Sequence, residues 1–393
     1  MPNIRRGMMG AAGVSSDPFP ETGGQIWSWG NNAVGQIGDG TTVRRSSPVQ
    51  VGDLSDWMFA GGLKEGANGV KDDGTLWTWG YNGGGDLGLG DTTNRSSPTQ
   101  VGDLADWFYS DGGQDACVAI KHDGTLWSWG WNDQGQLGTN NTTNYSSPVQ
   151  VGSLTDWKGN TTAELLAGYP IKVAVGYNTT LVIKDDGTLW GWGKNSSGQI
   201  GDGTNVAKSS PVQVGSLTTW QSVGKVNDSV LATRTDGTLW AWGEGTDGAL
   251  GQGNTTTYSS PVQVGALTTW ARICSNMQSS YAVKTDGTLW SWGKGGYKNL
   301  GHGNNTDYSS PVQVGSLTDW KHPGAATFAQ FNVKTDGTLW ACGTDDYGIL
   351  GTQGSSVTGN VCSPVQVGSA TDWGPILVTR MGSTMSIQRA VTG

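Results

Sequence analysis

The sequence is poor in charged residues, and it has no long hydrophobic run. Asp, Glu, Lys and Arg make up only 14% of the 393 residues, and the net charge is −9. A chain with this negative balance lacks the basic surface by which proteins hold the phosphates of nucleic acid or of anionic lipid. No apolar stretch approaches the roughly 18 residues that a membrane-spanning helix requires. The composition therefore predicts no nucleic-acid partner and no membrane span.

Cysteine is scarce, with four residues in the chain. Cys117, Cys274, Cys342 and Cys362 form no CxxC pair, and each stands where the other copies of a repeat carry a different residue. Zinc sites and redox motifs need closely spaced cysteines, so the pattern predicts neither. A disulfide between Cys342 and Cys362 stays open because both lie in one repeat, but nothing in the sequence requires it.

Histidine is scarcer still. His122, His302 and His322 fall at three different positions of the repeat, so no two of them are expected to face one site. We expect all three to be surface residues rather than bases or metal ligands. The sequence also has no nucleophile elbow, phosphate-binding loop or calcium loop. It therefore predicts no catalytic residue, no metal site and no cofactor, and a protein that is not an enzyme.

Glycine and tryptophan are abundant instead, with 65 Gly and 21 Trp, and they mark a repeat. Three markers each recur seven times: Trp-x-Trp-Gly, Ser-Pro-x-Gln-Val-Gly and a lone Trp. In the seventh copy of the first marker, Cys342 replaces the second Trp. Their positions are Trp27, Trp77, Trp127, Trp190, Trp240, Trp290 and Trp340; Pro48, Pro98, Pro148, Pro211, Pro261, Pro311 and Pro364; and Trp57, Trp107, Trp157, Trp220, Trp270, Trp320 and Trp373. A period of about 50 residues is typical of a solenoid or a propeller.

Each repeat has the pattern of four short β-strands. Six copies of Asp-Gly, such as Asp123-Gly124, separate two short apolar segments, and this dipeptide favours the two-residue turn of a hairpin. The two tryptophans after the turn are two residues apart, so they share one face of a strand. The proline marker and the lone Trp each indicate a further strand. We predict that the pairs form the scaffold by filling the contacts between neighbouring units, at Trp77, Trp79, Trp127, Trp129, Trp190, Trp192, Trp240, Trp242, Trp290 and Trp292.

The two ends of the chain complete one unit between them. The first unit starts at Gly24, after its hairpin turn, and lacks the strand that should precede the turn. Residues 385–390 have the pattern of that missing strand. We therefore predict one all-β domain over residues 23–393, a seven-bladed β-propeller of about 50-residue repeats, closed by the C-terminal strand that completes the first blade.

The repeat resembles that of the regulator of chromosome condensation family. The likeness rests on Asp-Gly-Thr-Leu-Trp-x-Trp-Gly followed by Asn-x-x-Gly-Gln-Leu-Gly, as in 123–130 and 132–138, and it covers about residues 23–393. It implies a seven-bladed propeller with terminal closure. The founding activity of that family is nucleotide exchange on a small GTPase, with chromatin binding through a basic tail. This chain is acidic, offers only Arg5 and Arg6 in its tail, and lacks the family's usual His before the hairpin turn, so we expect neither activity.

The copies differ from one another at positions that predict a binding surface. The segments after the lone Trp vary (58–69, 108–118, 158–181, 221–231, 271–282 and 321–332), as do the loop tips after Trp-x-Trp-Gly. Corresponding loops of a propeller emerge on one face, so we predict a ring of unlike side chains. The third unit is 63 residues long rather than 50, so it has 13 extra residues (63 − 50), within 158–173. We hypothesise that this insertion and Trp131 belong to one binding surface. The alternative is neutral drift of the loop. The candidate binding loops carry Tyr81, Trp131, Tyr169, Tyr297 and Tyr347.

Residues 1–22 stand outside the repeats and are predicted to be a flexible or docking tail, with Ile4, Arg5, Arg6, Met8 and Met9 as candidate contacts. This segment resembles the short N-terminal heads of tail and capsid-surface proteins of marine phages. Together with the low surface charge, it favours a structural or adhesive protein of a bacteriophage virion surface, a capsid decoration or a tail or fibre protein. Its partners would be other virion proteins, bound through the tail, and a host-surface ligand. The alternative is a bacterial scaffold, cell-surface or cytoplasmic, that binds a protein or a surface glycan.

Overall fold

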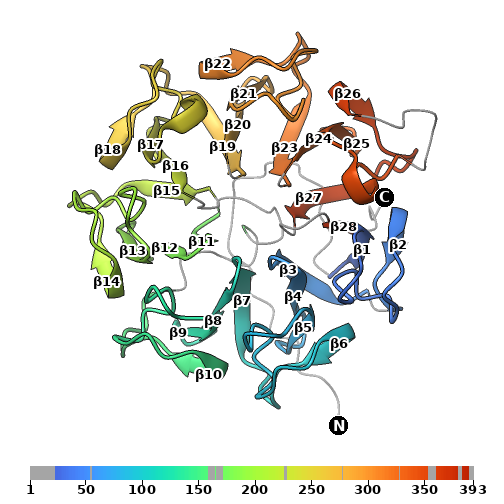
Figure 1. Cartoon of the computed structure of the whole chain (residues 1–393), viewed down its shortest axis with the longest axis vertical. Helices are drawn as coiled ribbons and strands as arrows, with labels where there is room; N and C mark the ends of the chain where they lie inside the picture. The colour runs from blue at the N-terminus through green and yellow to red at the C-terminus, as the bar shows by residue number, and fades with distance from the viewer. Residues whose placement is uncertain are drawn as a thin grey trace, which may run out of the picture.

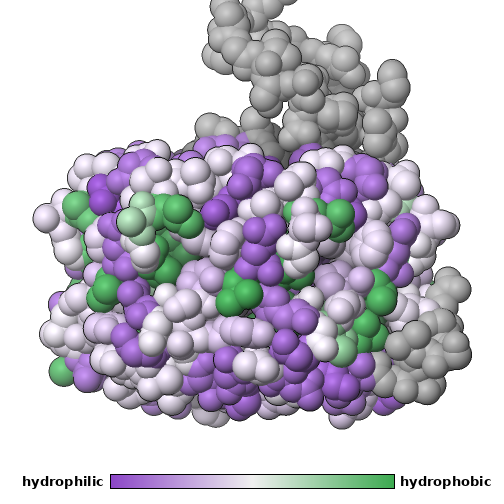
Figure 2. Space-filling model, turned by 90° about the horizontal axis from the view of Figure 1, so that it is seen from above, coloured by the Kyte–Doolittle hydropathy of each residue, from purple (hydrophilic) through white to green (hydrophobic). Residues whose placement is uncertain are grey.

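The computed structural model describes residues 23–53, 55–157, 164, 171–224, 228–276, 278–326, 328–352, 360–378 and 383–388. Its strands form seven antiparallel four-stranded sheets around a central axis, as Figure 1 shows. Seen edge on, the described part is a flattened disc with hydrophobic side chains in separate spots along its rim (Figure 2). Two short 3-10 turns, η1 (Thr246–Gly248) and η2 (Asp346–Gly348), lie in loops. The predicted seven-bladed propeller is confirmed.

We number the blades in ring order and give the strands of each from the axis outward. Blade 1 consists of β27 (Trp373–Val378), β28 (Ser383–Gln388), β1 (Gln25–Gly30) and β2 (Arg45–Gln50). Blades 2 and 3 consist of β3 (Trp57–Gly62), β4 (Gly66–Lys71), β5 (Leu76–Gly80) and β6 (Arg95–Gln100), and of β7 (Trp107–Gly112), β8 (Ala116–Lys121), β9 (Leu126–Gly130) and β10 (Tyr145–Gln150). Blades 4 and 5 consist of β11 (Val173–Val175), β12 (Thr179–Ile183), β13 (Leu189–Gly193) and β14 (Lys208–Gln213), and of β15 (Trp220–Val223), β16 (Ser229–Arg234), β17 (Leu239–Gly243) and β18 (Tyr258–Gln263). Blades 6 and 7 consist of β19 (Trp270–Ser275), β20 (Ser279–Lys284), β21 (Leu289–Gly293) and β22 (Tyr308–Gln313), and of β23 (Trp320–Ala325), β24 (Ala329–Lys334), β25 (Leu339–Gly343) and β26 (Val361–Gln366).

The Asp-Gly turn joins the second and third strands of blades 2 to 7, as its sequence predicts. In blade 2, Gly74 has φ of +78°, and a Cβ there would lie 2.4 Å from the carbonyl oxygen of Ala105 in the connection to blade 3. The Asp73 carboxylate accepts hydrogen bonds from N and Oγ1 of Thr75, whose hydroxyl in turn accepts one from Nε1 of Trp77. The bonds from Thr75 hold the pKa of Asp73 below its ordinary value. The Asp-Gly-Thr-Leu-Trp motif is therefore a structural hairpin.

Neighbouring blades are joined at two places by hydrogen bonds to the backbone. At the inner joint, Nε1 of Trp129 in blade 3 donates to the carbonyl of Asp86 in blade 2 at 2.9 Å. At the outer joint, N–H of Gly90 in blade 2 donates to the carbonyl of Ser146 in blade 3 at 2.7 Å. The inner bond recurs, at 2.7 to 3.0 Å, at Trp29, Trp192, Trp242 and Trp292. One joint therefore serves repeatedly around the ring.

The joint between blades 6 and 7 is different because Cys342 takes the place of the second Trp. Its Sγ lies 3.6 Å from the carbonyl oxygen of Asn299, the position that accepts an indole elsewhere, and 3.4 Å from Oε1 of Gln330. Gln330 is larger than its counterparts, for example Ala67 in blade 2, so it fills part of the missing indole's volume. Cys342 and Cys362 are free thiols, and burial raises the pKa of Cys342 above its ordinary value. The disulfide left open by the sequence is not formed.

Both ends of the chain build blade 1. β1 pairs with β28 from Gln25 opposite Gln388 to Gly30 opposite Ser383, and β27 flanks β28 on the axis side (Figure 1). Trp29 then makes the ordinary inner joint to blade 7. The predicted C-terminal closure is confirmed, and the strand that the lone Trp373 indicates also belongs to blade 1, beside β28.

The two tryptophans of a pair have different surroundings. The second one is fully buried in the seam between blades, whereas the first, such as Trp127, is half-buried. Trp127 and Trp107 both face Nζ of Lys121, which lies 4.6 and 4.9 Å from their ring centroids, and Asp106 is 3.2 Å from the same nitrogen. This division of roles differs from the shared contact expected from the sequence. The first Trp belongs to a cation–π and ion-pair group inside its own blade.

This group recurs around the ring. Lysine stands between the lone Trp and the first Trp of the pair in blades 2, 3, 4, 6 and 7, at Lys71, Lys121, Lys184, Lys284 and Lys334. Blade 5 has Arg234 at this position, and blade 1 has Gln388.

Candidate binding surface

The disc has two faces that the same repeat builds in different ways. We call the turn face the one with the Asp-Gly turns and the connections between blades, and the loop face the one with the loops between the first two and the last two strands of each blade. The loop tips that vary between copies have equivalent positions on the loop face. In blades 2 to 7 the N–H of this residue donates to a carbonyl in the loop between the first and second strands. These residues are Tyr81, Trp131, Lys194, Glu244, Lys294 and Thr344. They form a ring of unlike side chains on one face.

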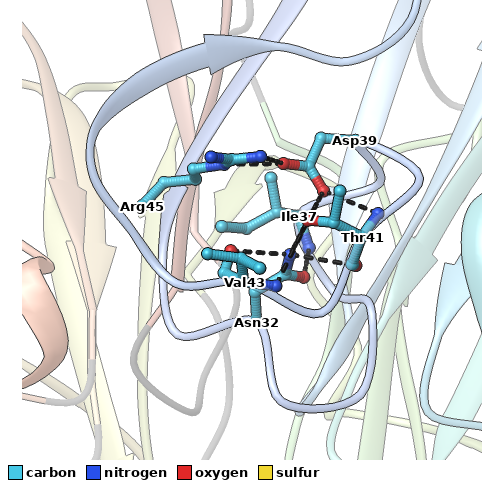
Figure 3. A network of polar contacts seen from close by, with 6 residues as sticks. All are labelled: Asn32, Ile37, Asp39, Thr41, Val43 and Arg45. Carbon is cyan, nitrogen blue, oxygen red and sulfur yellow. Dashed lines mark hydrogen bonds and ion pairs between the residues drawn. The ribbon is translucent and has the colours of Figure 1, made fainter.

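In blades 1 to 4 an asparagine organises the loop between the third and fourth strands. Nδ2 of Asn32 donates to the carbonyls of Thr41 and Val43 at 3.1 and 3.0 Å, and its Oδ1 accepts from N of Ile37 (Figure 3). Asp39 accepts from both Thr41 and Arg45, which fastens the far side of the loop. The equivalent asparagines are Asn82, Asn132 and Asn195. These four loops therefore have one common scaffold.

Blades 5, 6 and 7 lack this asparagine and have Gly245, Gly295 and Asp345 instead. Their loops contain three non-glycine residues with positive φ, at Asp247 (+57°), Lys298 (+61°) and Tyr347 (+67°). An L-residue in this conformation costs on the order of 1 kcal/mol. Lys298 stands where the other blades have a glycine of positive φ, such as Gly135 (+78°), so its conformation belongs to the repeat. Asp247 and Tyr347 stand at the position of Gln134 in blade 3, where none of blades 1 to 4 has positive φ. The loops of blades 5 and 7 are thus held in a strained shape that packing of the repeat does not require, and the loop of blade 6 has a lysine where the other blades have glycine.

Aromatic and charged side chains lie on these three loops and on the loop before β24, which contributes Phe328. The rings of Tyr297 and Phe328 lie 4.4 Å apart between centroids, and Phe328 is 37% exposed. Lys294 spans from the ring of Tyr297, at 5.7 Å, to Asp247, at 3.5 Å, and so links the loops of blades 5 and 6. Tyr347 is 49% exposed. We call Asp247, Lys294, Tyr297, Phe328 and Tyr347 the blade 5–7 patch.

A second cluster lies in the seam between blades 2 and 3. Tyr81 and Trp131, at corresponding loop tips, are 40% and 43% exposed. Asp86 follows Tyr81 in the same loop and is buried, and Trp131 donates its N–H to the carbonyl of Asp115. Burial and then the charge of Asp115 raise the pKa of Asp86 to about 7. We call Tyr81, Asp86, Asp115 and Trp131 the 2–3 seam cluster.

The candidate residues named from the sequence are therefore distributed over several places. Tyr81 and Trp131 share one sector, and Tyr297 and Tyr347 share another. Tyr169 and the tail residues of 1–22 lie outside the described residues. The insertion starts after Trp157, whose N–H donates to the carbonyl of Gly124 on the turn face. Trp157, which precedes the insertion, and Trp131 are thus at opposite faces, and residues 158–163 and 165–170 lie outside the described residues.

Two sequence expectations need correction. The variable segments after the lone Trp are largely the first two strands of each blade, the strands closest to the axis. Residues such as Phe108 and Tyr109 are buried there. Their variation reflects packing as well as surface. Of the histidines, only His122 is exposed; His302 is half-buried, and His322 is buried against Arg272 of blade 6.

Sequence comparison of the repeats did not point to Phe328 or Asp86. Phe328 belongs to a short loop between the first two strands that was grouped with a variable segment. Asp86 stands where Gln36, Gln136 and Gln199 stand in three other blades, and this exchange of amide for carboxyl was the available signal.

Within the described ranges, no group of three or more His, Cys, Asp or Glu side chains is arranged to hold a metal ion. The same part of the chain has no helix of the length and apolar character needed to cross a membrane.

Comparison with known proteins gives one family. Regulator of chromosome condensation (RCC1) repeats match residues 23–60, 73–120, 123–183, 186–225, 236–280 and 286–323, and a second description of the same repeat matches 171–199. A search of curated proteins gives no match.

Solved structures share the fold at low identity. Human WBSCR16 has a TM-score of 0.79 and 17% identity, over 94% of this chain and 99% of its own. Prp20p of Saccharomyces cerevisiae, described with its binding properties to Gsp1p and histones, has a TM-score of 0.80 and 15% identity, over 95% of this chain and 93% of its own. Yeast RCC1 (Prp20) bound to Kap60 has a TM-score of 0.79 and 14% identity, over 99% of this chain and 97% of its own.

Proposed function

Because the chain belongs to the regulator of chromosome condensation repeat family, we propose that it is a non-catalytic propeller that binds a protein partner through its loop face. Propellers of similar fold support the proposal that the partner is a protein. Prp20p is described with its binding properties to Gsp1p and histones, and yeast RCC1 is described bound to Kap60. The three histidines, in unrelated surroundings, support binding rather than catalysis as the activity.

One observation carries the choice of surface. Positive φ at Asp247 and Tyr347 occurs at a position where none of blades 1 to 4 has it, and both blades have lost the loop asparagine. Strain of this kind persists where a function requires the shape. The exposed Phe328 and Tyr347 then supply the large rigid rings that dominate protein interfaces. The blade 5–7 patch is our candidate for the centre of the interface.

A paired substitution tests this surface. The double variant Phe328→Ala and Tyr347→Ala should lose most of the partner bound by the wild-type chain in affinity purification with quantitative mass spectrometry. The matched control removes two side chains that are similarly exposed on the turn face, Leu267→Ala and Leu317→Ala, 45% exposed each, and should retain the partner. Retention by the loop-face variant and loss by the control would contradict the proposal.

For the biological setting, we propose a structural or adhesive role on a bacteriophage virion surface, with residues 1–22 docking to other virion proteins and the loop face presented outward. The support is the sequence of that segment and the low charge of the chain. The test is mass spectrometry of purified particles against soluble lysate, for the full chain and for a chain lacking residues 1–22. A fixed ratio to a capsid protein that disappears with the deletion is expected. Recovery only in the soluble fraction would favour a cellular scaffold instead.

A further inference from the structure

Trp131 is the one tryptophan of the chain that the repeat does not use. Seven first positions, six second positions and seven lone positions account for twenty of the 21 tryptophans. Those twenty are buried or half-buried, whereas Trp131 is 43% exposed. Packing of the propeller therefore gives no reason for an indole at this loop tip.

Two members of the 2–3 seam cluster, Tyr81 and Trp131, present aromatic rings at equivalent tips of neighbouring blades. Tyr81 is 40% exposed, and its ring lies against Gly83, where a Cβ would be 2.0 Å from the hydroxyl and 2.4 Å from Cζ. The φ of Gly83 is outside the left-handed region, so its backbone conformation does not require glycine. What the missing side chain provides is room for the ring to rest on the loop while the residue stays exposed.

An asparagine accompanies each of these rings. Oδ1 of Asn94 accepts from the backbone N–H that follows Tyr81, at 2.9 Å. Oδ1 of Asn144 accepts from the backbone N–H that follows Trp131, at 2.7 Å. Both asparagines are exposed, and the nitrogen end of each amide carries two N–H donors. We call Tyr81 with Asn94, and Trp131 with Asn144, the two aromatic–amide pairs.

Only blades 2 and 3 combine an aromatic ring with an amide at these two positions. The other blades have Asn31 and Arg44, Lys194 and Ala207, Glu244 and Thr257, Lys294 and Asp307, and Thr344 and Asn360. Neighbouring blades therefore have two copies of one arrangement that the repeat itself does not require. A duplicated arrangement of this kind suits a ligand that is itself made of repeated units.

The two rings stand alone in polar surroundings. Among the described residues on the loop face of blades 2 and 3, the exposed large hydrophobic side chains are Tyr81 and Trp131. Exposed Thr93 and Thr143 lie in the same two loops. A stable protein interface has a continuous apolar core and covers about 800 Å² on each partner. Separate rings among hydroxyl and amide groups fit a ligand whose every unit is partly apolar and partly polar.

The charges of these loops disfavour an acidic ligand. Glu65, Asp115 and Asp133 contribute carboxylates. The cations are Lys64 and Arg95, and an ion pair of 2.6 Å holds Arg95 to an aspartate of its own loop. A sulfated, phosphorylated or carboxylated ligand would meet mainly negative charge here. The ligand that these tips fit is therefore uncharged.

A neutral sugar unit matches an aromatic–amide pair group by group. One face of a sugar ring carries C–H groups, which are slightly positive, and the face of an aromatic ring is slightly negative. The hydroxyls at the edge of the sugar accept hydrogen bonds, and each pair offers amide N–H donors. We infer that the two aromatic–amide pairs are subsites for an uncharged glycan, each holding one sugar unit of a chain that lies across blades 2 and 3.

This site deepens the adhesive role proposed above and rests on it, because the loop face presented outward is the face that meets a host-surface polysaccharide. Two subsites on one rigid ring bind one chain more tightly than either does alone. A short glycan reaches one subsite and a longer one reaches both. Affinity should therefore rise steeply at the length that first reaches both rings, and loss of either ring should abolish that rise.

The test measures binding of fluorescent linear oligomers of glucose, mannose and galactose, from about two to about eight units, to the full chain by polarisation. At least one neutral series should bind with this length dependence. Oligogalacturonate, the carboxylated counterpart of the galactose series, should bind about tenfold or more weakly. A bound neutral glycan should also shield the exposed indole of Trp131 from acrylamide quenching, since the other tryptophans are less exposed.

Variants of the tip in blade 3 separate the ring from the amide. Trp131→Ala should weaken the longer glycans roughly tenfold or more and remove the length dependence, whereas Trp131→Phe keeps a ring and should retain most of the affinity. Asn144→Asp keeps the oxygen that accepts the loop hydrogen bond but removes the amide donors, so it should fold and bind more weakly. Blade 6 shows that such a loop accepts aspartate, because Asp307 takes the same bond from N of Gly295 at 2.8 Å. Leu154→Ala on the turn face, where Leu154 is 44% exposed, is the matched control and should bind as the wild type does.

Failure of every neutral series to bind the wild type would overturn the inference, as would equal glycan binding by the wild type and the double variant Tyr81→Ala and Trp131→Ala. Loss of a protein partner instead of a glycan from that double variant would assign the two rings to the protein interface. The proposed function is judged separately, on Phe328 and Tyr347 with the partner protein and on residues 1–22 with purified particles. Glycan binding without particle association would refute the virion setting alone.

Discussion

The turn face and the loop face come from the same seven repeats, yet only one of them is regular. On the turn face nearly every blade has the same Asp-Thr-Trp hairpin bonds and the same cation between two Trp rings. On the loop face blades 1 to 4 keep an asparagine-centred loop, whereas blades 5 to 7 lack the asparagine and each has a non-glycine residue with positive φ in this loop. The difference indicates that packing fixes the turn face in each copy. On the loop face, packing between blades constrains each loop only as far as the carbonyl that accepts the indole hydrogen bond. The rest of the loop is free to vary between copies and to carry function.

The largest effect should come from a joint that both faces depend on. Trp129→Ala removes a fully buried indole and its bond to Asp86, and it should lower the free energy of unfolding by about 3–5 kcal/mol. Trp127→Ala, at the half-buried partner position, should cost clearly less. Chemical denaturation of both variants checks the order. Equal losses would show that the two tryptophans do share one role.

The two faces should respond to pH in opposite directions. Asp86 on the loop face has its pKa raised from 3.8 to about 7, so the folded state binds more protons between these values and its contribution to stability falls as pH rises toward 7. The turn-face aspartates, such as Asp73 and Asp123, have lowered pKa values through Thr hydrogen bonds, so their contribution is lost as pH falls below about 4.

Denaturation of the wild type and Asp86→Gln between about pH 5 and pH 8 separates the two contributions. The free energy of unfolding of the glutamine variant, relative to that of the wild type, should rise by on the order of 2 kcal/mol as pH rises. A constant difference would mean that Asp86 is ionised throughout.

The cation groups of the turn face should each contribute a moderate amount. Lys121→Met keeps the aliphatic chain but removes the charge between Trp107 and Trp127, and it should cost about 1 kcal/mol. Asp106 is 49% exposed, so the ion pair adds little. Thermal unfolding measures the loss, and added salt should leave most of it in place. Complete rescue of the difference by salt would assign the effect to the ion pair.

On the loop face, relief of strain should stabilise the protein while weakening binding. Tyr347→Gly removes an L-side chain from φ of +67° and should raise the free energy of unfolding by about 0.5 kcal/mol, with reduced partner capture. Gln134→Gly, at the matching position of blade 3 where φ is not positive, should destabilise slightly. If both variants were destabilised equally, the loop at Tyr347 would not be strained.

The smallest effect should come from making blade 1 more regular. Blade 1 has Trp27, Trp373 and Asp372 but carries Gln388 where most blades have lysine. Gln388→Lys should supply the missing cation and stabilise the protein by about 0.5 kcal/mol. Differential scanning calorimetry of this variant against Gln25→Lys on the neighbouring strand gives the comparison. A loss of stability would show that the terminal blade does not reproduce the geometry of the others.

The fold could be predicted from the sequence because each marker has a local physical cause that repeats. Asp123-Gly124 specifies a hairpin on its own, and the missing first hairpin indicated the closure by residues 385–390. The roles within the Trp pair could not be separated, because a period of two places Trp127 and Trp129 on one face without saying which one meets Lys121.

The binding surface was only partly predictable. Exposed Tyr81, Trp131 and Tyr347 were identified as loop tips, since exposure of a variable loop follows from the repeat alignment. The contact between the tilted rings of Tyr297 and Phe328 joins two loops, 31 residues apart (328 − 297), that no local pattern connects. The raised pKa of Asp86 depends on burial and on Asp115 of the next blade, and neither is encoded nearby. Function on this face arises between loops, which a repeat-by-repeat comparison treats separately.

The most direct test places a photo-crosslinking amino acid at Phe328 on the loop face and, in a second chain, at Leu267 on the turn face. We predict that the chain modified at 328 forms a covalent adduct of defined mass with the partner in its native setting, and that the chain modified at 267 does not. Adducts formed from position 267, with none from 328, would contradict the assignment of binding to the loop face.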